Sequence, residues 1–154
     1  LVDLTPKVRE CIEAYYQYNK GVAPQRIIFY RDGVANNQFA NECNEEIKSI
    51  MRACLEHGGG DYVPELIYIV AQQRTRCRLA QTDQSGRAFG NVACGTVVDK
   101  DIVSLPPTGQ QPNNFYMVSQ HGLKGTARPM HYHVLRNDAG IPLEEIERLF
   151  IASK

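Results

Sequence analysis

Apolar residues follow a helical period in two stretches of the first sixty positions. In the first stretch they are spaced by one to four residues, as on one face of a helix: Val8, Cys11, Ile12 and Tyr15. Thr5-Pro6 directly before them is a typical helix start, so we predict a helix over residues 6–19. A second helix is predicted from Asn36 or Asn37, which would cap its start, to Gly58, which would end it. Its apolar stripe consists of Phe39, Cys43, Ile47, Ile50, Met51 and Cys54.

Two continuous apolar runs predict buried strands. The first covers residues 26–31, and the turn signal Asp32-Gly33 ends it. The second, residues 65–71, is nearly all apolar, as expected for a strand that is covered on both faces. Asp32 is therefore predicted at the carboxyl end of a buried strand, which is the edge where open α/β sheets tend to carry ligands.

From residue 74 onward the pattern changes to shorter strands between turn-rich segments. Strands are predicted at residues 74–79, 96–99, 115–119 and 131–135, and a last helix begins at Pro142. The order helix, strand, helix, strand, several strands and helix predicts an α/β layered domain. The chain begins without Met and its last helical pattern has no stop signal, so we expect a piece of a longer protein.

Composition and charge narrow the classes of function. The 154 residues are enough for one domain with one core. Lys+Arg and Asp+Glu both number 17, so the formal net charge is zero and any binding to nucleic acid must use a local patch. No apolar run approaches the ~18 residues that cross a bilayer, and we expect no membrane partner. The five cysteines lack CxxC spacing, which favours reduced thiols and a cytoplasmic or nuclear protein.

Asp32 is the first candidate for chemistry, and two interpretations of it are open. A carboxylate beside glycine at the end of a strand can simply stabilise the turn. It can also bind a metal ion, but hydrolysis with two Mg²⁺ ions needs several oxygen ligands around the metals. In the second interpretation, Asp32 needs partner residues from elsewhere in the fold.

A basic segment is the second candidate. Arg74, Arg76 and Arg78 alternate, so on a strand their side chains would point to one face, and guanidinium groups bind phosphate oxygens in pairs. The alternative is an ordinary solvated face. Lys124 and Arg128 lie in a glycine-flanked loop whose backbone N–H groups can also reach phosphates.

Two further motifs are interpreted as structural. His131 and His133 would share a strand face, and we interpret them as neutral, hydrogen-bonded histidines rather than as ligands of a zinc ion, for which no third ligand is evident. The run HGGG, residues 57–60, is similar to the oxyanion loop of lipases, but the chain has no G-x-S-x-G motif. We therefore interpret it as a helix end followed by a turn.

Five segments in this order resemble the PIWI domain of Argonaute/Piwi proteins: IIFYRDGV from Ile27, IVAQQR from Ile69, GTVVD from Gly95, FYMVS from Phe115 and GTARPMHYHVL from Gly125. The resemblance covers essentially the whole chain, residues 1–154, as part of a single PIWI domain. It implies an RNase H-like α/β fold that is incomplete at both ends. The segments TARP and HYH favour the Argonaute branch, whereas Gln120 departs from it.

The resemblance also implies roles for particular residues. Asp32 matches the Arg-Asp-Gly motif, which supplies one acidic ligand to a catalytic site with two Mg²⁺ ions; the other catalytic residues of the family lie outside this chain. The fragment alone is therefore not expected to cut RNA. Contacts with guide RNA and paired target RNA are implied for six residues: Gln72, Arg74, Arg76, Arg78, Lys124 and Arg128. Tryptophan-binding pockets of animal members would use this region's helices, where Glu13 and Gln17 are polar.

Three functions follow as hypotheses. The first is an RNA-guided RNA endonuclease, with Mg²⁺ as the cofactor of the complete protein. The second is a non-slicing protein that binds guide and target RNA and recruits other silencing factors. A nucleotide-binding α/β module is disfavoured, because the chain has neither G-x-G-x-x-G nor a P-loop.

Overall fold

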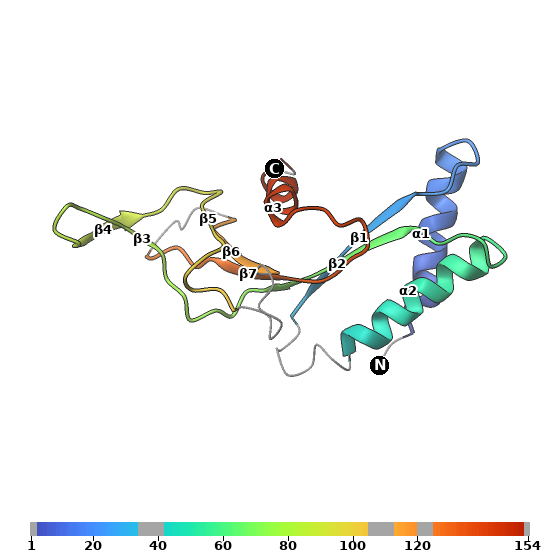
Figure 1. Ribbon diagram of the computed structural model, residues 1–154, viewed down its shortest axis with the longest axis horizontal. Helices are drawn as coiled ribbons and strands as arrows, with labels where there is room; N and C mark the ends of the chain where they lie inside the picture. Colours follow the sequence, from blue (N-terminus) through green and yellow to red (C-terminus); the bar gives the residue numbers. More distant parts are fainter. Residues whose placement is uncertain (1–2, 34–41, 105–112, 120–124, 153–154) are drawn as a thin grey trace. The chain divides into compact units, whose positions relative to one another are not determined.

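The computed structural model describes residues 3–33, 42–104, 113–119 and 125–152 (Figure 1). Five strands form one sheet in the order β1-β2-β7-β6-β5, and β3 and β4 form a separate two-stranded sheet. Among the described helices, none has the length and apolar character that a bilayer span requires. The elements in chain order are α1 (Thr5–Tyr18), β1 (Arg26–Asp32), α2 (Asn44–His57), β2 (Glu65–Gln72), β3 (Ala80–Thr82), β4 (Ala88–Asn91), β5 (Val97–Val98), β6 (Asn114–Met117), β7 (Met130–Asn137) and α3 (Leu143–Ala152).

The chain divides into two compact units. The first comprises residues 1–29, 34–68 and 136–139, and the second comprises residues 30–33, 69–135 and 140–154. The mixed α/β composition and the five-stranded sheet confirm the predicted fold class.

The first unit is built on the pair of helices α1 and α2. Ile12 of α1 is buried, as are Ile50 and Cys54 of α2, and the two helices pack against each other. Cys11 and Tyr15, which the predicted stripe of α1 includes, are exposed, so only part of that stripe lies in the contact. The ring of Phe29 stacks on Tyr68 with centroids 5.2 Å apart. The predicted caps Asn36 and Asn37 and the stripe residue Phe39 lie outside the described residues.

One buried polar contact in this unit was not predicted. The Tyr68 hydroxyl donates a hydrogen bond to the carboxylate of Glu46, a buried residue of α2. Burial, and then this bond, raise the pKa of Tyr68 well above its ordinary value. The bond gives both buried polar groups a partner, which a polar pair in a core needs in order not to destabilise the fold.

The second unit has its core where antiparallel strands meet α3. β6 pairs with both β5 and β7, and Phe115 lies opposite Tyr132 in the β6–β7 register. The ring of Phe150 on α3 lies 4.4 Å from that of Tyr132 and 5.9 Å from that of Phe115, measured between centroids. Because Phe115 is fully buried, this aromatic cluster fixes α3 against the sheet.

The prediction of a strand over residues 74–79 is wrong. The segment from 73 to 79 has no regular secondary structure, and the next strand begins at Ala80. Instead of pairing with a neighbouring strand, the backbone turns locally: the Thr75 N–H donates to the Gln73 carbonyl at 3.0 Å. The hairpin of β3 and β4 was not predicted, because none of its residues belongs to an apolar face.

Candidate active site and nucleic-acid interface

Asp32 is the last residue of β1 and is exposed. The strand ends there because Gly33 has φ +80°, a left-handed conformation that disfavours other residues. The Gly33 N–H donates to the carbonyl of Ala71 on β2 at 3.2 Å, which places Asp32 and Gln72 at neighbouring strand ends. The predicted position of Asp32 at the end of a strand is therefore confirmed, but the predicted burial of that strand is wrong: β1 is at the edge of the described sheet, and its residues alternate between exposed and half-buried. Asp32 belongs to the second unit together with Gln72.

The carboxylate of Asp32 differs from that of an ordinary turn aspartate. Within the described residues, no hydrogen bond or ion pair reaches it, and the Arg31 guanidinium donates instead to the Asp32 backbone carbonyl at 2.6 Å. Asp83, by contrast, uses its carboxylate to hold a turn together through bonds from Ser85 and Arg87. The described part of the chain thus leaves the Asp32 carboxylate turned to solvent.

The described residues place only this one carboxylate at the strand end. No group of three or more His, Cys, Asp or Glu side chains suited to a metal ion occurs among them. Oxygen ligands of this kind suit Mg²⁺, but one carboxylate does not make a two-metal site. The described residues alone therefore do not fit a complete magnesium centre.

The three arginines after β2 keep the alternation that the sequence predicts, although they are not on a strand. Arg74, Arg76 and Arg78 are exposed, whereas Thr75 and Cys77 between them are half-buried. The Arg78 guanidinium folds back and donates to the carbonyls of Thr75 and Cys77, at 3.1 and 2.7 Å. The half-buried residues hold the segment, and the arginines remain at the surface.

A loop preceding β7 lies beside this segment. The Thr75 hydroxyl donates to the Pro129 carbonyl at 2.9 Å, which joins the arginine segment to the loop. Arg128 is exposed between buried Ala127 and Pro129, and so its position is fixed by its neighbours. Lys124, the other cation predicted here, lies outside the described residues.

The side chain of Asn91 ties the same loop to the hairpin. Its amide nitrogen donates to the Gly125 carbonyl, and its amide oxygen accepts from the Ala127 N–H, both at 2.8 Å. Sequence reasoning missed Asn91, and the sequence carries no local signal for this contact. We name the exposed arginines of residues 72–91 and 125–129 the arginine surface: Arg74, Arg76, Arg78, Arg87 and Arg128.

The arginine surface carries a strong local charge in a chain of zero net charge. Across residues 72–91 and 125–129 there are five arginines, and the only acidic residue is Asp83. The bonds from Ser85 and Arg87 that hold the carboxylate lower the pKa of Asp83. A concentration of guanidinium groups of this kind suits phosphate groups.

His131 and His133 lie on β7, directly after the loop. Their ring centroids are 3.9 Å apart, and the ring of His131 stacks on Tyr116 at 4.0 Å. His131 Nε2 lies 2.9 Å from the Asn114 Oδ1, and because an amide oxygen only accepts, the imidazole donates. Burial lowers the pKa of both rings to about 4, which favours neutral rings at pH 7, and the bond to Asn114 is a hydrogen bond of the predicted kind for His131.

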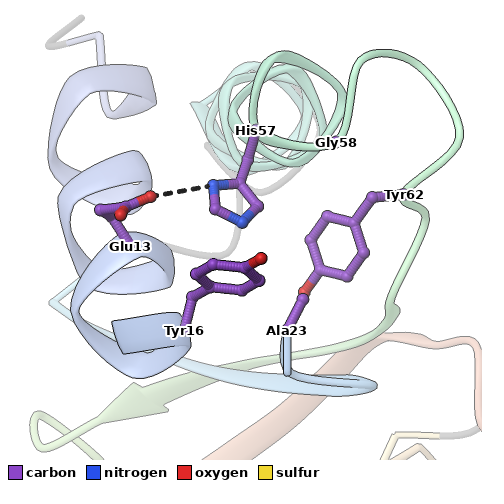
Figure 2. Close-up of a pocket in the computed structure, with 6 residues that line it drawn as sticks. All are labelled: Glu13, Tyr16, Ala23, His57, Gly58 and Tyr62. Carbon is purple, nitrogen blue, oxygen red and sulfur yellow. Dashed lines mark ion pairs between the residues drawn. The ribbon is translucent and has the colours of Figure 1, made fainter. Parts of the chain in front are cut away.

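A cavity of about 370 Å³ opens in the first unit, where α1 approaches the end of α2 (Figure 2). His57 lines it between three other lining residues: its Nδ1 is 3.5 Å from the Glu13 carboxylate, and the rings of Tyr16 and Tyr62 meet its ring edge to face. Gly58 ends α2, as the predicted helix end requires. A Cβ on Gly58 would lie 2.1 Å from that of Tyr62, so only glycine fits this wall.

Comparison with known proteins identifies the class of domain that this fold represents. The C-terminal lobe of a budding yeast Argonaute superposes with a TM-score of 0.81 at 27% identity, over 94% of this chain and 30% of that one. Drosophila Piwi superposes with a TM-score of 0.76 at 30% identity, over 95% of this chain and 19% of that one. Both are Argonaute/Piwi structures, which confirms the RNase H-like fold predicted from the sequence.

The family follows from the sequence comparisons. The Piwi domain model matches residues 1–152, and the chain belongs to this family. It is 41% identical over 152 residues to putative protein tag-76 of Caenorhabditis elegans and 38% identical over 147 residues to protein argonaute 7 of Arabidopsis thaliana. These alignments cover 97% and 96% of this chain, but the chain spans only 14% of the length of either relative.

Proposed function

We propose that this chain is part of a small-RNA-guided silencing protein, in which it binds a guide RNA and its paired target RNA. Membership of the Piwi domain family supports this, as does one similar structure, an Argonaute of Kluyveromyces polysporus that was solved with a guide RNA. The arginine surface is the part of the chain suited to the phosphates of such a duplex. Base pairing between guide and target then carries the sequence information, so the protein needs contacts with the backbone only.

Within this proposal, Asp32 is one ligand of a two-metal site for RNA cleavage in the complete protein. The observation that supports it is the exposed carboxylate of Asp32 at the end of β1, beside Gln72 at the end of β2. Bound Mg²⁺ would supply Lewis-acid stabilisation of the charge on the reacting phosphate. By resemblance to the family, the remaining ligands would come from parts of the complete protein outside this chain.

The test is the Asp32→Asn variant of the complete protein, loaded with a guide RNA. Asn keeps the size of the side chain and removes the charge, so cleavage of the target should fall about a hundredfold to a thousandfold, a loss of roughly 2.7 to 4 kcal/mol in transition-state stabilisation. Affinities for guide and target should stay within a few-fold. Asp61→Asn is the matched control, because Asp61 is also exposed but belongs to the first unit.

Two results would contradict the catalytic role of Asp32. If Asp32→Asn loses guide binding or unfolds much earlier than the Asp61→Asn control, Asp32 is a structural turn residue. If the parent protein binds guide and target but cuts nothing, the complete protein is the non-slicing silencing factor.

The cavity of Figure 2 favours that second candidate function, the recruitment of a protein factor. Three aromatic rings line it, and large apolar side chains lie exposed in the same unit: Tyr15, Tyr18, Val22 and Val63. An open aromatic cavity suits an aromatic side chain of a partner. By resemblance to animal members, we propose a tryptophan of a silencing factor as the occupant.

The Gly58→Ala variant tests recruitment separately from cleavage. Its added Cβ must displace Tyr62, so binding of a tryptophan-containing peptide to the complete protein should fall about tenfold or more, while cleavage remains. Arg52→Ala, at an exposed position of α2 outside the cavity lining, is the control. If the parent and Gly58→Ala bind the peptide equally well, the cavity is not the binding site for a tryptophan of a silencing factor.

A further inference from the structure

The hairpin of β3 and β4 presents an aromatic ring that the fold does not use. Every residue from Ala80 to Asn91 is exposed, and Phe89 has 66% of its surface accessible. A phenylalanine stabilises a protein when the fold buries it, and at this position most of that stabilisation is absent. Packing within the described part of the chain therefore does not explain Phe89, whereas contact with a ligand would. In Figure 1 the hairpin stands at one end of the second unit.

A bulge in the hairpin determines where this ring sits. Gln81 pairs with Gly90 and Thr82 pairs with Ala88, so Phe89 is the extra residue on β4 and has no partner on β3. A bulge of this kind interrupts the regular alternation of side chains and changes the direction in which one of them points. The bulge falls on the only aromatic residue of the hairpin.

The turn of the hairpin is held by several hydrogen bonds. The carboxylate oxygen Oδ1 of Asp83 accepts bonds from the Ser85 N–H at 2.9 Å, the Ser85 hydroxyl at 2.6 Å and the Arg87 N–H at 2.9 Å. Gly86, at φ +80°, supplies the left-handed residue that the turn needs. The strand that carries Phe89 thus starts from an ordered turn, which lowers the entropy lost on binding.

The other end of the hairpin is fixed to the arginine surface. Asn91, two residues after Phe89, holds the loop that carries Arg128 through its two 2.8 Å bonds. Arg87 precedes Phe89 by two residues and is itself exposed. Phe89 is therefore two residues from Arg87 and two residues from Asn91, which holds the Arg128 loop, and the single acidic group of the hairpin is already bound within the turn.

We propose that Phe89 stacks on an unpaired base of single-stranded RNA that continues beyond the guide-target duplex, while the neighbouring arginines contact its phosphates. The excess of arginine over acidic residues favours a polyanion over a protein partner. A single exposed ring suits an unpaired base, because the bases of a duplex are already stacked on one another. This inference rests on the proposed function and adds a contact with RNA outside the paired region.

The experiment compares targets that differ only in their unpaired ends. The complete, guide-loaded protein is titrated with a target that has no extension, one with adenosine extensions at both ends, and one whose extensions have the same phosphates but no bases. Phe89→Ala should raise the Kd for the adenosine-extended target about tenfold, as expected for one stacked base. It should leave the other two Kd values unchanged, and Phe89→Trp should restore the parent value.

Further variants separate stacking from folding and from charge. Tyr18→Ala, which removes an 89% exposed aromatic residue from the first unit, should change none of the three affinities. A fluorescent adenine analogue in the extension should be quenched by the parent and by Phe89→Trp, but not by Phe89→Ala. Arg87→Ala should weaken both extended targets equally, because it acts on phosphates.

The outcomes distinguish this inference from the function on which it rests. If the parent binds guide and paired target but Phe89→Ala changes all three affinities equally, or none, the stacking contact is wrong and the proposed function stands. If Phe89→Ala instead releases a co-purifying protein and keeps every RNA affinity, the hairpin binds a protein and the inference is overturned. If the parent binds no guide or target, both proposals fail together.

Discussion

β2 and the stretch that follows it are consecutive in the chain and opposite in character. Leu66 to Ala71 in β2 are six buried residues in a row, and five of them have no accessible surface. From residue 73 to 91 the chain turns outward, and its arginines and Phe89 are exposed. The side chains of β2 pack in the core, whereas the arginines and Phe89 of the following stretch are accessible to a ligand.

The boundary between these stretches lies beside the candidate catalytic residue. β2 ends at Gln72, next to the strand end that carries Asp32. The buried strand thus provides a rigid support, and the exposed stretch carries the side chains that we propose contact RNA, an arrangement that is common where functional loops leave a sheet. Substitutions in the two stretches should consequently differ in kind, with loss of stability in β2 and loss of RNA binding after it.

The largest effect is expected from Ile69→Ala in β2. Ile69 has no accessible surface, and the substitution removes a buried side chain and leaves a cavity, which should lower the free energy of unfolding by about 3 kcal/mol. RNA binding and cleavage should fall together, in proportion to the folded fraction in urea or thermal unfolding. Ile69→Val, which removes one methylene group, should cost only about 1 kcal/mol. A selective loss of cleavage with unchanged stability would show that Ile69 acts in function and not only in the stability of β2.

A second prediction concerns a buried residue that does not follow the apolar pattern. Glu147 on α3 is buried, and its Oε1 has no hydrogen-bond partner within the described residues. Burial, with smaller contributions from Asp99 and Glu144, raises the pKa of Glu147 from 4.5 to about 7. Because the folded state binds this proton more tightly than the unfolded state, stability should be highest below pH 4.5 and should fall as the pH rises to about 7.

Glu147→Gln should abolish this pH dependence. At pH 8 the variant should be more stable than the parent by about 1 to 2 kcal/mol, after allowance for screening by solvent, and near pH 4 the two should be equal. Hydrogen exchange of α3 in the complete protein, compared at each pH with Glu145→Gln as the exposed control, measures the difference. A variant that is less stable than the parent at pH 8 would show that the carboxylate is charged and paired.

Asn91→Ala tests a structural contact within the exposed stretch that follows β2. Asn91 is exposed yet makes two hydrogen bonds to the loop of Gly125 and Ala127, so its loss should cost about 1 kcal/mol locally. Hydrogen exchange should accelerate at residues 125–129 and leave β2 unchanged. Gln84→Ala, at the exposed tip of the same hairpin, should have no effect on the loop. Equal effects of the two variants would mean that the amide bonds do not hold the loop.

The smallest effect on stability is expected from Arg76→Ala. An exposed arginine contributes little to folding, so the free energy of unfolding should change by less than about 0.5 kcal/mol. If Arg76 contacts a phosphate, RNA binding should weaken about equally for all guide sequences, and the slope of log K against log salt should decrease by roughly 1. Arg52→Ala, an exposed arginine on α2, is the control. An unchanged slope of log K against log salt would mean that Arg76 contacts solvent and not a phosphate.

The sequence by itself determined the elements whose signals are local. β1 and β2 were predicted to within one residue at each end, because continuous apolar runs and the Asp32-Gly33 turn are read directly from neighbouring residues. Helix α1 was predicted to within one residue at each end for the same reason, from its proline and its apolar stripe. The position of Asp32 at a strand end and the exposure of alternate arginines were likewise predictable.

The tertiary structure decided what depends on partners far along the chain. Residues 74–79 have strand-like alternation, but among the described residues no strand pairs with them, and they remain irregular. The contact of Asn91 with Gly125 spans 34 residues, and the burial of Glu147 depends on how α3 packs in the second unit. The bulge at Phe89 depends on the register of two short strands, which neither strand specifies alone. A local pattern records the preference of a segment, whereas pairing, register and burial are set by the segments that it meets.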